Sequence, residues 1–230
     1  MDEVTESDVL AFAAERIAQR RPAQIATVNA EFVMHARRDS SFLDVLRVCD
    51  LRTPDGFGVV LAARRRGLSI GGRVGGSDLI WSLSEQASRL NHRIFLLGAR
   101  PGIAKQAADR LASRFPDLVV AGTYPGSPYP PDDASQIRLI QEARPDVLFV
   151  AFGAPQQDLW IARVKEQLAV PVIMGVGGSF DYVAGAARRA PRWMRDSGFD
   201  WLFRLVRQPW RWQRMLVLPQ FAFLAMVRSD

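Results

Sequence analysis

The clearest indication of the fold comes from two stretches: TVN at residues 27–29 and, one predicted helix later, RTPDGFGVV at residues 52–60. In both, a short hydrophobic segment ends in polar residues, and in the second an acid stands between a proline and a glycine. Residues just past the carboxyl ends of parallel strands line the ligand crevice of an open α/β sheet. Asp55 is therefore a candidate general base held on a rigid turn. Its alternative role is to cap the helix that starts near Gly58.

The rest of the chain continues this alternation of short apolar runs with helical patterns. An opening helix is predicted over residues 7–19, with Ser7 as its N-cap. Buried strands are predicted at residues 24–28, 51–53, 94–98, 119–123, 147–152 and 172–176. Helices are predicted between them at residues 42–48, 59–66, 77–90, 102–115, 134–143 and 157–168. This order predicts an α/β fold in which a parallel sheet is covered by helices on both faces.

The composition is that of an ordinary globular protein, since 48% of the 230 residues are hydrophobic and 23% are charged. The acidic residues that follow Met1 do not fit a signal peptide, and no apolar run approaches the roughly 20 residues of a membrane-spanning helix. The single cysteine, Cys49, fits a reducing compartment. Only Lys105 and Lys165 are lysines, so arginine carries nearly all the positive charge behind the net charge of +6.

Glycine-containing turns follow three of the predicted strands. Residues 98–102 (GARPG) are placed to hold a phosphate at a helix start, or else form only a tight turn. Residues 153–158 (GAPQQD) present Gln157 to the crevice, unless this is a solvated first helical turn. Residues 175–181 (GVGGSFD) allow a ligand to approach the backbone closely. There, Asp181 either accepts hydrogen bonds from a ribose or base, or caps a helix.

The C-terminal part of the chain has a different composition, rich in arginine and tryptophan. Arg204, Arg207, Arg211 and Arg214 recur at helical spacing, although Pro209 must kink or split the helix. A basic amphipathic stretch with many tryptophans favours an anionic membrane surface, and the alternative is a solvated face on an ordinary packing helix. We therefore divide the chain into a core at residues 1–190 and an appendage at residues 191–230.

Several motifs that would indicate other chemistry are missing from the sequence. There is no Asp-x-Asp motif, no His/Cys cluster for zinc, no P-loop and no nucleophile elbow. The sequence therefore predicts neither a metal nor a cofactor. An NAD-dependent oxidoreductase stays an alternative, although the dinucleotide glycine fingerprint is absent. A basic nucleic-acid-binding protein is a second alternative, because it would explain the net charge.

Taken together, these motifs resemble those of the WecG/TagA/CpsF glycosyltransferases over about residues 23–214. Each motif is weak alone, but the eight occur in one order and are jointly specific. They are Thr27-x-Asn29, Asp55-Gly56-x-Gly58-Val59-Val60, Arg73-x-x-Gly76-x-Asp78, Phe95-Leu96-Leu97-Gly98, Gly153-x-Pro155-x-Gln157, Gly175-Val176-Gly177-Gly178-x-Phe180-Asp181, Arg189-Ala190-Pro191-x-Trp193, and Trp201-Leu202-x-Arg204-Leu205 with Pro209-x-Arg211.

The resemblance implies a Rossmann-like core with a C-terminal helical, membrane-associating appendage. It implies an inverting, metal-independent enzyme of cell-surface polysaccharide biosynthesis. Such an enzyme moves N-acetylmannosamine, its uronic acid or a hexose from a UDP-sugar to a polyprenyl-diphosphate-linked sugar. The implied location is the inner face of the cytoplasmic membrane, and family members often self-associate. No nucleic acid takes part in this activity.

The resemblance also implies roles for individual residues. Asp55 matches the proposed catalytic base, and matches to substrate-site residues are found at Thr27, Asn29, Arg73 and Gln157. The appendage arginines thought to hold the diphosphate match Arg204, Arg211 and Arg214. From the crevice turns we add Gly153 and Asp181 as substrate-binding candidates, and Gly126 is added from the loop at residues 124–131 that follows a predicted strand.

Overall fold

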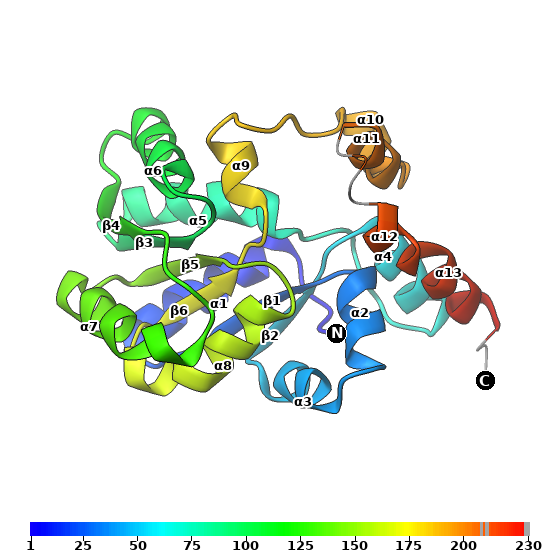
Figure 1. Ribbon diagram of the computed structural model, residues 1–230, viewed down its shortest axis with the longest axis horizontal. Coiled ribbons are helices and arrows are strands. Elements are labelled where there is room, and N and C mark those ends of the chain that lie inside the picture. The colour runs from blue at the N-terminus through cyan, green and yellow to red at the C-terminus, as the bar shows by residue number, and fades with distance from the viewer. Residues whose placement is uncertain (208, 210–211, 228–230) are drawn as a thin grey trace.

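The computed structural model describes residues 1–207, 209 and 212–227, without the side chains of residues 192, 196, 204, 214 and 227. Its centre is a parallel sheet with the strand order β2-β1-β6-β5-β3-β4 (Figure 1). The strands are β1 (Gln24–Val28), β2 (Leu51–Pro54), β3 (Arg93–Gly98), β4 (Val119–Tyr124), β5 (Val147–Ala151) and β6 (Val172–Gly175). The predicted α/β fold is therefore confirmed.

Helices cover both faces of this sheet. One face carries α1 (Glu6–Gln19), α5 (Gly76–Arg89), α6 (Ile103–Arg114) and α9 (Ser179–Val183), whose apolar residues share one core cluster with the strands. The other face carries α3 (Ser40–Val48), α7 (Asp133–Ala143) and α8 (Gln156–Leu168). The remaining core elements are α2 (Ala30–Ala36), α4 (Phe57–Arg65) and the 3₁₀ turn η1 (Pro130–Asp132).

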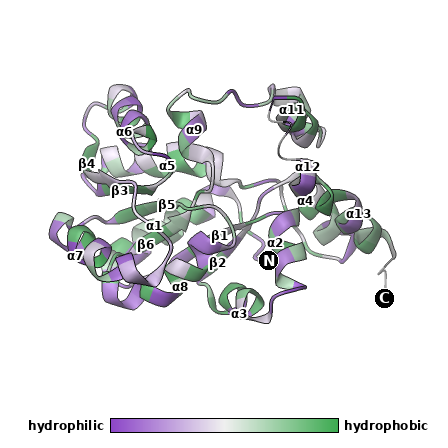
Figure 2. Cartoon of the chain, in the orientation of Figure 1, coloured by the Kyte–Doolittle hydropathy of each residue, from purple (hydrophilic) through white to green (hydrophobic). Residues whose placement is uncertain are grey.

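The strands form because their residues are apolar on both sides and are covered on both sides. Along β5, Val147 and Phe149 pack into the cluster on one face, whereas Leu148 and Val150 pack into the cluster on the other. Every residue of β5 is buried, and Figure 2 shows its hydrophobic character. A continuous apolar run is the expected sequence of a strand buried in a parallel sheet.

Three helices differ from the sequence-based prediction: two have a different N-cap, and one was not predicted. The first helix is capped by Thr5 rather than Ser7, since the Thr5 side chain accepts a hydrogen bond from the Asp8 backbone N–H. The helix after β2 has Gly56 as its N-cap, so the capping role considered for Asp55 is wrong. The short helix α2 was not predicted, because seven residues span too few turns to show a helical period.

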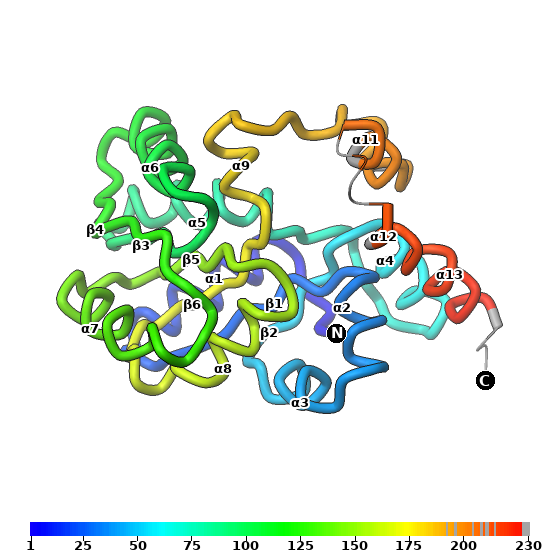
Figure 3. The backbone as a smooth tube through the Cα atoms, in the orientation of Figure 1, coloured from blue at the N-terminus to red at the C-terminus, as the bar shows by residue number. Residues whose placement is uncertain are grey.

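Among the described residues, four further helices follow the core: α10 (Arg192–Asp196), α11 (Asp200–Arg207), α12 (Trp212–Met215) and α13 (Val217–Val227). Pro209 lies between α11 and α12, as the sequence predicts. Figure 3 traces the chain from α9 across to α11 and then down through α12 to α13. Phe221 of α13 packs against Met34 of α2 and Val59 of α4. Within the described residues, no helix combines the length and apolar character needed to cross a bilayer.

Candidate functional site

A cavity of about 710 Å³ lies at the carboxyl ends of the strands. Its lining combines residues that follow the strands with residues of α11, α12 and α13. Seven of the site residues predicted from the sequence line it: Thr27, Asn29, Asp55, Gly126, Gly153, Gln157 and Asp181. Residues that are far apart in the chain therefore meet in one crevice, as expected for an open α/β sheet.

The end of β1 supplies two of these residues, and both are already tied into the fold. Thr27 is buried, and its hydroxyl donates a hydrogen bond to the carbonyl oxygen of Gly175 at 3.4 Å. Asn29 caps α2, since its side-chain oxygen accepts a hydrogen bond from the Phe32 backbone N–H at 3.1 Å. These bonds fix the orientation of both side chains before any ligand arrives.

Gln157, in the first turn of α8, is almost completely buried at the floor of the cavity. Its side-chain oxygen accepts a hydrogen bond from the Gly177 backbone N–H at 2.9 Å. A Cβ atom at Gly175 would lie 2.5 Å from the Gln157 side-chain nitrogen, so only glycine leaves room for the amide there. Gln157 is thus a fixed floor residue, so the alternative of a solvated first helical turn is wrong for Gln157, although Gln156 is exposed.

Asp55 follows β2, and its carboxylate contacts the guanidinium of Arg73. The Arg73 Nη1 atom donates to Asp55 Oδ1 at 3.4 Å, and Arg73 Nη2 donates to Asp78 Oδ2 at 2.5 Å. The Asp55 side chain is about one quarter exposed, at 25%. Arg73 is one of the predicted site residues, but it does not line the cavity. It lies next to the cavity through its contact with Asp55, which does line it.

The opposite wall is formed by the turns after β3 and β4 and by α9. Asp181 pairs with Arg100 of the 98–102 turn at 2.9 Å, so it does not serve as a helix cap. Gly126 has a φ of +51°, and a Cβ atom there would lie 2.2 Å from the side-chain oxygen of Gln136. That buried glutamine hydrogen-bonds both the N–H and the carbonyl of Ser127, which fixes the loop.

The C-terminal helices complete the cavity from above. Trp201 of α11, Met215 of α12 and Phe221 of α13 all line it. The predicted diphosphate residues belong to this region, but Arg211 lies outside the described residues. Arg204 and Arg214 lie in α11 and α12 by their backbone, and their side chains are likewise outside the description. The predicted roles of these three arginines stay predictions.

The sequence analysis quoted Asp78 in the Arg73-x-x-Gly76-x-Asp78 motif but gave it no role, and in the structure several arginines converge on its carboxylate. Burial alone would raise the pKa of Asp78. The hydrogen bond and charge of Arg189, together with the charges of Arg73 and Arg195, outweigh burial and hold that pKa below its ordinary value. Arg73 lies five residues before Asp78, in the same motif, but Arg189 and Arg195 come from a distant part of the chain, so no local pattern predicted that all three meet at this carboxylate.

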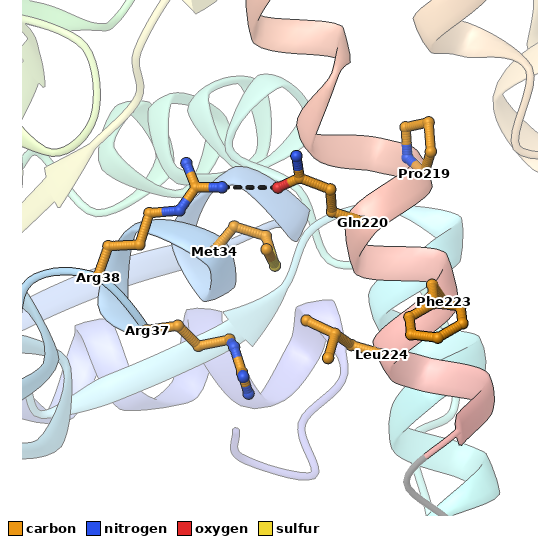
Figure 4. Close-up of a pocket in the computed structure, with 7 residues that line it drawn as sticks. All are labelled: Met34, Arg37, Arg38, Pro219, Gln220, Phe223 and Leu224. Carbon is orange, nitrogen blue, oxygen red and sulfur yellow. Dashed lines mark hydrogen bonds between the residues drawn. The ribbon is translucent and has the colours of Figure 1, made fainter.

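Two other features of the described residues bear on binding. No three His, Cys, Asp or Glu side chains gather closely enough in that part of the chain to form a metal site. A second cavity, of about 590 Å³, lies between α2 and α13 (Figure 4). There Arg38 donates a hydrogen bond to the Gln220 side chain at 2.6 Å, and Phe223 and Leu224 form the apolar side. This second cavity contains none of the predicted site residues.

Comparison with known proteins agrees with the motifs. The family described as "Glycosyl transferase WecG/TagA/CpsF family" matches residues 1–229. Three relatives share the name N-acetylglucosaminyldiphosphoundecaprenol N-acetyl-beta-D-mannosaminyltransferase. The chain is 36% identical to the one from Bacillus subtilis (strain 168), over 90% of this chain and 80% of the relative. Identity is 33% to that of Bacillus spizizenii (strain ATCC 23059 / NRRL B-14472 / W23), covering 88% and 78%. It is 30% to that of Staphylococcus aureus (strain MW2), covering 86% and 78%.

Proposed function

The chain belongs to the WecG/TagA/CpsF family of glycosyl transferases, and on this premise we propose that it transfers a sugar from a UDP-sugar to a polyprenyl-diphosphate-linked sugar. The relatives are named for adding N-acetylmannosamine to N-acetylglucosaminyldiphosphoundecaprenol. N-acetylmannosamine is therefore the first donor sugar to test, followed by its uronic acid and by hexoses. One observation carries the proposal: Asp55 lies in a cavity bounded by the strand ends on one side and by C-terminal helices on the other.

The proposed reaction is a single displacement at the anomeric carbon, with inversion. A hydroxyl of the acceptor sugar attacks that carbon, and the bond to the β-phosphate oxygen of UDP breaks. Asp55 accepts the hydroxyl proton as the new glycosidic bond forms. Its position at the cavity supports this role.

The departing UDP carries negative charge. The proposed mechanism uses no metal, so groups of the protein must stabilise this charge. The turn with Ala99 and Arg100 precedes α6, and the turn with Gly153 precedes α8. Backbone N–H groups at such helix starts favour phosphate oxygens. Arg100 adds a guanidinium at the same wall. We assign the diphosphates of the substrates to this wall and to Arg204, Arg211 and Arg214, which makes these groups the charge stabilisers.

The lipid tail of the acceptor is assigned to the C-terminal helices. Trp212 and Phe223 expose more than half of their side-chain surface, and α13 carries no charged residue. Exposed apolar and aromatic residues next to arginines suit the headgroup region of an anionic membrane. We propose that residues 191–230 form an appendage that attaches the 1–190 core to the inner face of the cytoplasmic membrane. Self-association is a further expectation for this chain from its family.

The test is transfer itself, measured with purified protein. UDP-N-acetylmannosamine, its uronic acid analogue and UDP-hexoses are each incubated with a short-chain lipid-diphosphate N-acetylglucosamine in the presence of EDTA. We expect acceptor-dependent release of UDP from one donor, with a product heavier by that one sugar and with inverted anomeric configuration. The proposal fails if no donor reacts and UDP does not bind. Turnover that requires an added divalent cation would overturn the metal-independent part alone.

A further inference from the structure

Asp78 is the point at which the region beside the catalytic cavity and the C-terminal segment of the chain meet. It lies in the first turn of α5, where the positive end of the helix favours a carboxylate. From the segment after α9, Arg189 donates from Nη1 to Asp78 Oδ1 at 2.7 Å and from Nη2 to Oδ2 at 2.9 Å. This is the paired geometry in which arginine binds carboxylate most specifically. Arg195 of α10 adds a third contact, with its Nη1 at 3.5 Å from Asp78 Oδ1.

The same carboxylate also holds Arg73, the residue that contacts the proposed base. Asp78 Oδ2 accepts from Arg73 Nη2 at 2.5 Å, while Arg73 Nη1 reaches Asp55 at 3.4 Å. Of the two carboxylates, Asp78 makes the closer contact with the guanidinium of Arg73. Arg73 is largely buried, with 23% of its side chain exposed, which limits the positions open to it.

Gly75 shows how tightly this arrangement is packed. A Cβ atom at Gly75 would lie 2.4 Å from Asp55 Oδ1 and 3.1 Å from Arg73 Nη1. Its backbone φ of −101° is one that any residue adopts, so the glycine is needed for space and not for its conformation. Asp55 and Arg73 therefore rest on the backbone at Gly75, and a displaced Arg73 would displace Asp55 with it.

We propose that Asp78 is a positioning residue that couples the C-terminal segment to the base Asp55 through Arg73, an inference that rests on the proposed function. Arg189 and Arg195 occupy the outer side of the Asp78 carboxylate, and Arg73 shares its Oδ2 atom. When the C-terminal segment is docked, the charge of Asp78 is divided between these two arginines. Arg73 then stays at a distance from Asp55. Without Asp78, Arg73 moves onto Asp55 and occupies the oxygen that must accept the proton.

The first test is Asp78→Asn, which keeps the size of the side chain and removes its charge. We expect kcat to fall by about 10- to 100-fold, because a displacement of about 1 Å at a catalytic group has an effect of that size. The KM for the UDP-sugar should change by less than about twofold, since donor contacts stay in place. Asp78→Glu should recover part of the lost kcat. A kcat within about twofold of wild type for Asp78→Asn would overturn the proposal.

Asp50→Asn is the matched control for losing a partly buried, ion-paired aspartate. Asp50 accepts from the Gln24 backbone N–H at 2.9 Å and pairs with Lys165 at 3.0 Å, at the amino ends of the strands. Its loss should lower the melting temperature without lowering kcat. If Asp78 only anchored the C-terminal helices, Asp78→Asn would likewise reduce stability and raise the acceptor KM, leaving kcat at saturation unchanged. That result would refute a positioning role.

A double-mutant cycle with Arg189→Gln tests whether the coupling runs through Asp78. We expect Arg189→Gln to lower kcat by itself, and the pair Arg189→Gln with Asp78→Asn to be no worse than Asp78→Asn alone. Fully additive losses would contradict a shared path. Failure of the proposed function is distinguishable, because the wild-type protein would then show no sugar transfer at all. Active wild type with an unaffected Asp78→Asn variant overturns only the positioning role.

Discussion

The sheet core and the C-terminal helices use apolar side chains in opposite ways. In the core, large residues such as Phe149 and Trp160 are completely buried. In the C-terminal segment, many large apolar residues are exposed: Trp193, Phe199, Trp201, Leu202, Val206, Trp212, Leu216, Phe223 and Met226. Scattered exposed apolar residues are ordinary on a protein surface, but a concentration of them in one segment marks an interaction surface.

The difference indicates how the two halves of the cavity are held. The floor consists of strand ends and helix starts that are fixed by the packed core, including the buried Gln157. The upper side is joined to that core by Phe221 against α2 and α4 and by the arginines on Asp78. We therefore expect the transfer reaction to depend on the residues of the floor. Binding of the lipid substrate is expected to depend on the C-terminal helices.

The largest expected effect is on the floor, from Asp55→Asn. An amide cannot accept the acceptor's proton, so we expect kcat to fall by about 10²- to 10⁴-fold. UDP binding measured by calorimetry and the melting temperature should stay close to wild type. Asp109→Asn serves as the control, because Asp109 is an exposed carboxylate paired with Lys105 on α6. Near-normal turnover of Asp55→Asn would remove Asp55 from the role of base.

The sequence predicted the floor well because buried parallel strands leave a direct signal. Each predicted strand lies within one residue of the observed one, since a continuous apolar run admits few alternatives. The polar residues after the strands were placed in the crevice by a general property of open sheets. Thr27, Asn29, Asp55 and Gln157 were found in this way, and all four line the cavity.

What the sequence could not predict are the contacts between distant side chains. The ion pairs of Asp78 join α5 to residues 111 positions later, and no periodicity reports such a separation. Arg73 was expected among the substrate-binding residues, yet it does not line the cavity, and its guanidinium contacts Asp55 and Asp78. The close approach of Asp55 to Gly75 likewise depends on two segments brought together by the fold.

The second prediction concerns the C-terminal helices. We expect the double variant Trp212→Ser, Phe223→Ser to lose binding to vesicles containing anionic lipid by about 100-fold or more, since burying one large apolar side chain contributes about 2 kcal/mol. The fold should be retained because both side chains are exposed. Val48→Ser, Leu90→Ser is the control, with similar exposure on the core. Vesicle co-sedimentation measures both. Equal binding by the two double variants would show that the helices are no different from the rest of the surface.

The third prediction uses Asp158, which contrasts with Asp78. Asp158 is fully buried, and its pKa is raised to about 7. Burial is the main cause, and it outweighs the nearby amides of Gln157 and Gln24, which lower the pKa. The folded state therefore holds a proton that the unfolded state releases near pH 4. The bound proton on Asp158 therefore stabilises the folded state. This stabilisation is fully present below about pH 4 and is lost as the pH rises through about 7. Asp78 has the opposite sign, because its pKa is lowered and its contribution is lost only in acid.

Asp158→Asn separates these two responses. We expect the wild-type protein to unfold more easily at pH 8 than at pH 5, and the variant to lose most of that difference. At pH 8 the variant should be more stable by roughly 1 to 4 kcal/mol, since each unit of pKa is worth about 1.4 kcal/mol. Chemical denaturation at the two pH values measures this. A wild-type stability that rises steadily from pH 5 to pH 8 would show that Asp158 is ionised in the folded protein.

The smallest effect is expected from a single methyl group on the floor. Gly175→Ala would place a Cβ atom 2.5 Å from the Gln157 amide nitrogen and 2.9 Å from its Cδ atom. The side chain must shift, which costs about 1 to 3 kcal/mol and moves the amide away from the Gly177 N–H. We expect weaker UDP-sugar binding by calorimetry and a lower melting temperature. Gly72→Ala is the control away from the cavity, because its Cβ atom would meet nothing within 4 Å. If both variants bind donor equally well, the position of Gln157 does not govern donor binding, and the rigid floor supports the fold and not recognition of the substrate.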